Sequence, residues 1–277
     1  MGKTPKDERD GREVWSRDEV DGHPQVSTRK YHVGIKWAAD GGLDRMLVGQ
    51  RKNVEQYEWD VPVFTMRIPT IVAPQPKNNR FSAQQRARVV LVEKSVASIL
   101  HDVQSKVSGA SPDEILISEY GFDIFHDVRL LGGDGRFEGR YEVKCQDRYH
   151  PHYRKPWKEY EDDEYDGTER VCVEERNAKG PSGISTTDAD WWVDAFPFPG
   201  GEISTVLVLP VPTVRAVSSW CDSHSYVVDR MDDVGAYKGD MGDWEGTTGI
   251  CYNPRWYWVQ DFEAIRKECK RLDEEDD

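Results

Sequence analysis

The sequence predicts an α+β fold in which a mixed central β-sheet is flanked by helices, with additions at both ends of the chain. Three observations predict it: a long amphipathic segment at 82–107, a run of β-rich segments after it, and glycine- and proline-rich breaks between them. One helix followed by several strands is typical of α+β domains, and of α/β domains where strands pair in parallel. A chain of 277 residues is long enough to bury its own core.

The N-terminal part is expected to lie outside the core. Residues 1–28 are almost wholly polar, which predicts a flexible arm. Residues 29–80 form a β-rich addition, because β-branched and aromatic residues are concentrated at 31–37 and 61–68.

The predicted core spans 81–212. Its helix at 82–107 is predicted from Val89, Val92, Val96 and Val103, which recur at helical spacings. Strands are expected at 114–118, 121–131, 137–145, 170–174, 190–196 and 204–210. The C-terminal addition, 213–277, should contain a short helix at 213–221, a tryptophan-rich strand at 255–260 and an acidic terminal helix.

Composition limits the classes of protein to which the chain can belong. The formal charge is −14, with 51 acidic side chains against 37 Lys and Arg, so the whole surface does not coat nucleic acid. A local basic groove stays compatible with this charge. The acidic excess suits either a high-salt environment or an ordinary acidic protein, and the composition leaves both open.

Three patterns are absent from the sequence, and their absence bears on the location of the protein and on the redox state of its cysteines. The five cysteines contain no C-x-x-C pair, which favours reduced thiols over a zinc or disulfide framework. No stretch has the roughly 20 apolar residues of a membrane span, and the N-terminus lacks the apolar core of a signal peptide. We therefore expect a cytoplasmic protein with no membrane partner.

Chemistry is concentrated in one predicted hairpin. The run Gly132–Gly135 should fold the strand 121–131 back onto 137–145. Side chains alternate along a strand, so Glu142 and Lys144 share one face while Tyr141, Val143 and Cys145 point into the core. A turn centred between 133 and 134 would put Asp127 opposite Arg140 and diagonal to Glu142. Two carboxylates there could share one Mg²⁺, which prefers oxygen ligands.

These residues carry a family resemblance. Asp127, the later tripeptide Glu142-Val143-Lys144, and Glu93 on the preceding helix resemble the PD-(D/E)XK nuclease superfamily, whose fold is called restriction-endonuclease-like. The segments 171–174 and 180–193 are similar to phage-type members, so the resemblance covers about 82–210. It implies a Mg²⁺-dependent nuclease, with Mn²⁺ able to substitute.

The resemblance also implies roles for single residues. Asp127 and Glu142 would bind the metal, Lys144 would lie at the attacking water, and Glu93 would be an accessory acid. His126 stands where the motif has proline, and Asp123 remains a rival to Asp127 because both have the same strand parity.

Nucleic acid, most simply DNA, is the expected partner. Cationic side chains and one tyrosine lie near the first helix and in the insertion 149–169. They should bind phosphates and stack on bases. These residues are Arg80, Arg86, Arg88, Tyr153, Lys155 and Lys158. A viral or phage-encoded enzyme would act in the host-cell cytoplasm. The alternative is a catalytically silent nucleic-acid-binding or viral assembly or regulatory protein on the same fold. Endo- or exonucleolytic cutting, RNA as substrate and a homodimer stay open.

Overall fold

The computed structural model describes a large part of the chain. The described residues are 6–7, 12–15, 25–73, 83–110, 116–119, 128–131, 135–146, 171–177, 179–198, 201–215, 218, 236–240 and 248–252. The strand expected at 255–260, the terminal helix and the insertion 149–169 lie outside them.

The chain divides into two compact units. Unit 1 comprises residues 1–148 and 188–210, and unit 2 comprises 149–187 and 211–277. Within residues 29–73, the described strands belong to the same unit and the same sheet as the predicted core strands 137–145, 190–196 and 204–210, whereas a separate addition was expected there.

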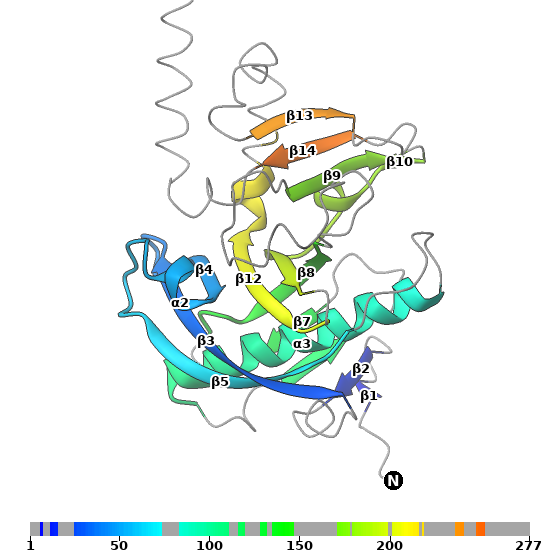
Figure 1. Cartoon of the computed structure of the whole chain (residues 1–277). Coiled ribbons are helices and arrows are strands. Elements are labelled where there is room, and N and C mark those ends of the chain that lie inside the picture. Colours follow the sequence, from blue (N-terminus) through cyan, green and yellow to red (C-terminus); the bar gives the residue numbers. More distant parts are fainter. Residues whose placement is uncertain are drawn as a thin grey trace, which may run out of the picture. The chain divides into compact units, whose positions relative to one another are not determined.

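Unit 1 is built on one mixed sheet of ten strands (Figure 1). In sheet order these are β1 (Lys6–Asp7), β2 (Arg12–Trp15), β6 (Leu116–Glu119), β7 (Val128–Leu131), β8 (Gly139–Cys145), β11 (Trp191–Pro197), β12 (Ile203–Pro210), β4 (Leu43–Gly49), β3 (Val26–Trp37) and β5 (Phe64–Ile71). Within the described strands, β8 and β11 form the one parallel pair. The mixed sheet of an α+β class is thus confirmed.

Helix α3 (Ala83–Ser108) confirms the predicted long helix. Its buried residues Val92, Val96 and Leu100 belong to one apolar core with Tyr141 and Val143 of β8 and several residues of the other strands. Polar contacts fix the helix beside β5, because Ser95 Oγ receives a hydrogen bond from the backbone N of Ile71 at 3.0 Å. The short helix α2 (Arg51–Val54) follows β4. None of the described helices is both long and apolar enough to cross a membrane.

The N-terminal arm differs from expectation. Strands β1, β2 and the start of β3 fall within residues 1–28, and β2 pairs with β6 through Val14 and Ser118. Strand β4 was also not predicted. Two adjacent charged residues, Asp44 and Arg45, interrupt the apolar pattern by which a strand is recognised. Arg45 is nevertheless only 7% exposed, and its Nε donates a hydrogen bond to Asp44 at 2.9 Å.

Unit 2 contains a second, antiparallel sheet. Its order is β10 (Gly180–Pro181), β9 (Val171–Asn177), β14 (Thr248–Tyr252) and β13 (Ala236–Asp240). The 3-10 helix η3 (Gly183–Ser185) follows β10. Strand β9 confirms the strand expected at 170–174, whereas β13 and β14 were not predicted. Residues 211–215 and 218 are helical, which agrees with the start of the helix expected at 213–221.

Glu202 connects the β11–β12 turn to β3 through polar contacts. Ser27 Oγ donates to Glu202 Oε1 at 2.6 Å, and Arg29 Nη2 contacts Oε2. Burial alone would raise the pKa of Glu202, but the hydrogen bonds from Arg29 and Ser27 outweigh it, so the pKa lies below its ordinary value of 4.5. The ionised form therefore stabilises the folded state.

This contact predicts a pH dependence of stability. The contribution of Glu202 should be complete above pH 4.5 and be lost as pH falls through the lowered pKa. Because the pair is partly exposed, Glu202→Gln should lower the free energy of unfolding by about 0.5–1 kcal/mol at pH 7, and by less at pH 3. Urea denaturation between pH 3 and 7 measures this, with Glu138→Gln as an exposed control. A difference that is constant with pH would contradict it.

Candidate active site

Strand β8 presents two chemically different faces. Tyr141 and Val143 are 0% and 3% exposed and lie in the apolar core with α3, which confirms the expected alternation. Glu142 and Lys144 extend from the opposite face, where Lys144 Nζ donates to Glu142 Oε1. Glu142 is 8% exposed as a residue, while the Lys144 side chain is 35% exposed. Glu142 is therefore nearly buried, while part of the Lys144 side chain is exposed.

The parallel neighbour β11 extends this face. Trp192 pairs with Glu142, and Asp194 pairs with Lys144. Paired residues of neighbouring strands project from the same face of a sheet. Lys144 Nζ lies 5.4 Å from the centroid of the Trp192 ring, within the range of a cation–π interaction. Neither Trp192 nor Asp194 was predicted as a site residue, although an aspartate inside an apolar strand is itself a signal.

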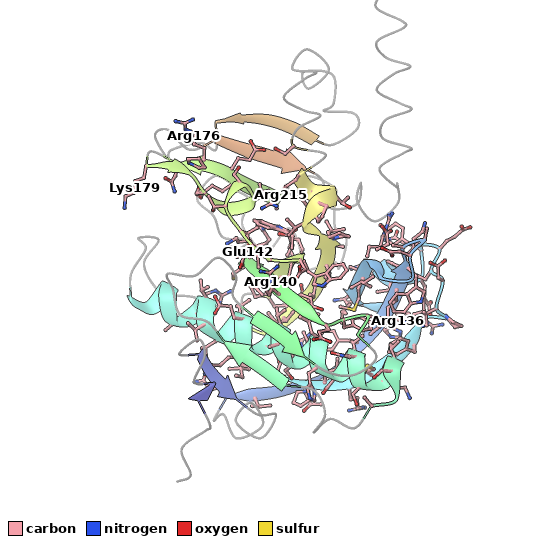
Figure 2. The ribbon with its side chains drawn as sticks, turned by 180° about the vertical axis from the view of Figure 1, so that it is seen from behind. Arg136, Arg140, Glu142, Arg176, Lys179 and Arg215 are labelled. Atoms are coloured by element: carbon pink, nitrogen blue, oxygen red, sulfur yellow. The ribbon has the colours of Figure 1, made fainter. Side chains whose placement is uncertain are left out.

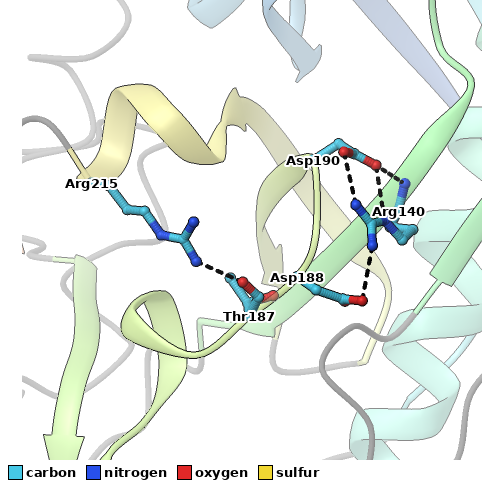
Figure 3. A network of polar contacts seen from close by, with 5 residues as sticks. All are labelled: Arg140, Thr187, Asp188, Asp190 and Arg215. Atoms are coloured by element: carbon cyan, nitrogen blue, oxygen red, sulfur yellow. Dashed lines mark hydrogen bonds and ion pairs between the residues drawn. The ribbon is translucent and has the colours of Figure 1, made fainter.

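Arg140 joins the start of β8 to the segment before β11 (Figure 3). Its Nε and Nη2 donate to the carboxylate of Asp190 at 3.2 Å each, and Nη1 donates to Asp188 at 2.9 Å. The hydrogen bond with Asp190 is the largest cause of a raised pKa of Arg140. The backbone N of Asp190 also donates to the backbone O of Arg140 at 2.8 Å. These contacts fix the parallel register that aligns Glu142 with Trp192.

The hairpin register differs from the predicted one. Val128 pairs with Tyr141 and Arg129 pairs with Arg140, whereas Asp127 was expected opposite Arg140. The expected register was wrong by two residues because the turn extends past Gly135, where the backbone N of Glu138 donates to the Gly135 O at 3.2 Å. Gly135 itself has a φ of 80°, which favours glycine. Asp127, like Asp123 and His126, lies outside the described residues.

Of the remaining predicted site residues, the structure describes the side chains of Glu93 and Arg88, and both belong to α3. Glu93 is 7% exposed on α3, the helix that covers the opposite face of β8. Arg88 is 3% exposed, so its guanidinium is not presented on the surface as the predicted basic strip requires. Arg86 lies in α3 but its side chain is outside the description, as are Arg80, Tyr153, Lys155 and Lys158 altogether.

Among the described residues, those on or in contact with the polar face of β8 and β11 carry an excess of negative charge. Arg140 and Lys144 stand against four acids that lie on this face or contact it: Glu142, Asp188, Asp190 and Asp194. Such an excess fits a divalent cation, and carboxylate oxygens suit Mg²⁺. Within the described residues, however, no three His, Cys, Asp or Glu side chains are grouped so that they could hold a metal ion. The described part thus supplies one expected ligand, Glu142, and the second, Asp127, is outside it.

In unit 2 a loop is fixed by buried and polar contacts. Arg215 donates from Nε to the Ile184 O at 2.9 Å. Its Nη2 donates to the Thr187 O at 2.6 Å (Figure 3). Glu174 Oε1 accepts hydrogen bonds from Ser182 Oγ and from Asn177 Nδ2. Arg176 and Lys179 on the β9–β10 hairpin are exposed cations (Figure 2).

Comparison of the chain with protein-family models, with curated proteins and with solved structures finds no match.

Proposed function

We propose that this chain is a metal-dependent nuclease that hydrolyses phosphodiester bonds of DNA, with its active site on the polar face of β8. The observation that carries the proposal is the direct contact between the Glu142 carboxylate and the Lys144 ammonium on that face. A carboxylate beside an ammonium, on a rigid strand with apolar residues behind it, combines a metal ligand with a cation that can orient water or phosphate. The mixed sheet with a helix along one face supports the restriction-endonuclease-like fold.

The roles follow from the chemistry of each side chain. Glu142, held at 8% exposure, would supply carboxylate oxygen to the metal, and Lys144 would hold the attacking water or stabilise charge on the phosphate. Asp127 immediately precedes Val128, and Glu142 immediately follows the strand partner of Val128, Tyr141. This sequence relation supports Asp127 as the second ligand. Bound Mg²⁺ would lower the pKa of a coordinated water and neutralise phosphate charge.

Cleavage assays test the proposal directly. Purified full-length chain is incubated with supercoiled plasmid, linear duplex and end-labelled single-stranded DNA, with Mg²⁺, with Mn²⁺ or with EDTA. We expect cleavage of at least one substrate with either metal and none in EDTA. Single-stranded RNA in the same panel separates the two nucleic acids. Metal-independent binding to DNA without cleavage would contradict the proposal and favour the catalytically silent alternative.

A further inference from the structure

Asp194 is a carboxylate in the interior of unit 1. The residue is 0% exposed, although its neighbours in β11 are mostly apolar. Removing a carboxylate from water costs several kcal/mol unless hydrogen bonds or a positive charge compensate for it. Its Oδ1 accepts hydrogen bonds from Gln146 Nε2 at 2.7 Å and from Trp192 Nε1 at 3.2 Å. These two donors are neutral side chains, and a nearby positive charge would compensate further for the buried carboxylate.

Lys144 supplies a positive charge on the neighbouring strand. Asp194 and Lys144 are paired residues of the parallel β8–β11 ladder, so their side chains leave the same face. Trp192 contacts both groups: its indole N–H donates to Asp194, and its ring lies 5.4 Å from Lys144 Nζ. The orientation of the indole ring therefore depends on Asp194, and the position of the ammonium depends on the ring.

We propose that Asp194 is a positioning residue, which holds Lys144 at the active site by orienting Trp192 and by its own negative charge. Gln146 completes the arrangement, since it follows β8 directly and its backbone N donates to the Ala195 O at 2.8 Å. The inference rests on the proposed function only in its premise that Lys144 acts in cleavage. The positioning of Lys144 itself does not depend on it.

The test compares Asp194→Asn with the exposed control Glu138→Gln, which removes the same charge near the start of β8. Asparagine keeps the size of the side chain and an oxygen for Gln146 and Trp192, so a residue needed only as a hydrogen-bond acceptor would be replaced without loss. We expect Asp194→Asn to lower kcat about tenfold or more, with KM changed less than twofold. Its unfolding temperature should lie below that of wild type, because the substitution removes one partner of a buried charge pair.

A second readout reports on Lys144 without catalysis. Lysines are dimethylated with ¹³C-formaldehyde, and the Lys144 methyl signal is assigned by its loss in Lys144→Arg. This signal should shift in Asp194→Asn and stay in place in Glu138→Gln. Trp192→Phe keeps an aromatic ring but lacks the N–H donor, so it should also shift the Lys144 methyl signal. This variant replaces Asp194→Asn in the experiment if Asp194→Asn does not fold.

The outcomes separate the two proposals. Wild-type kcat together with an unshifted Lys144 signal in Asp194→Asn would overturn the role of Asp194 and leave the nuclease proposal intact. Absence of cleavage by wild type would overturn the nuclease proposal, whereas the Lys144 signal would still decide whether Asp194 positions the ammonium.

Discussion

Glu142→Gln and Lys144→Met should each lower the rate of metal-dependent cleavage by about 10²- to 10⁴-fold. Glutamine keeps the shape of a side chain that is 8% exposed, but it removes the negative charge that a divalent ion requires. Methionine keeps an unbranched apolar stem near Trp192 and removes the ammonium. Single-turnover cleavage of the best substrate in the panel measures both rates.

The controls separate chemistry from folding. Glu138→Gln and Lys106→Ala change the same charges at exposed positions of unit 1 and should cleave at the wild-type rate. Thermal unfolding checks that each active-site variant is folded, since each breaks the contact between Lys144 and Glu142. A folded Glu142→Gln variant that cuts at a near wild-type rate would remove Glu142 from the active site.

Gly183→Ala should destabilise unit 2 by about 2–4 kcal/mol, the other large effect we expect. Gly183 has a φ of 52°, and a Cβ there would lie 2.2 Å from the backbone O of Glu174. Backbone atoms cannot rotate away as a flexible side chain can, so η3 would have to separate from β9.

Gly180→Ala, in the preceding strand β10, is the matched control. Its φ is 132°, but a Cβ there would meet no atom within 4 Å, so only the backbone strain, on the order of 1 kcal/mol, should appear. Urea denaturation followed by circular dichroism compares the two variants with wild type. Equal losses at Gly183 and Gly180 would mean that the close approach to Glu174 does not determine stability.

Elements with strong periodicity were predictable from the sequence. Apolar residues at helical spacings identified α3, and β-branched runs identified β8, β11 and β12 within three residues at each end. The alternation of Tyr141 and Val143 with Glu142 and Lys144 was predictable because a strand has a period of two residues.

Other features depend on contacts that the sequence does not show. The predicted β7–β8 register was wrong because a glycine-rich segment can form turns of several lengths. A longer turn shifts the strand pairing but can leave each side chain on the same face of the sheet. Strand β4 was missed because Asp44 and Arg45 pair with each other inside an otherwise apolar strand. The cross-strand pairing of Asp194 with Lys144 could not be predicted, because it requires knowing that β11 lies parallel to β8, and the order of strands is a property of the whole sheet.

The parallel pairing of β8 with β11 also has a consequence for biosynthesis. Antiparallel neighbours can be joined by a tight turn, but here residues 146–190 are made between the two strands, and most of them belong to unit 2. A nascent chain that ends before residue 188 lacks both β11 and β12. Strand β8 then has β7 as a neighbour but no strand on its other edge, and β4 lacks its partner β12. Synthesis proceeds from the N-terminus at about 5–20 residues per second, so the strand with Glu142 and Lys144 waits several seconds for its partner. During that interval its exposed edge can pair with a second chain.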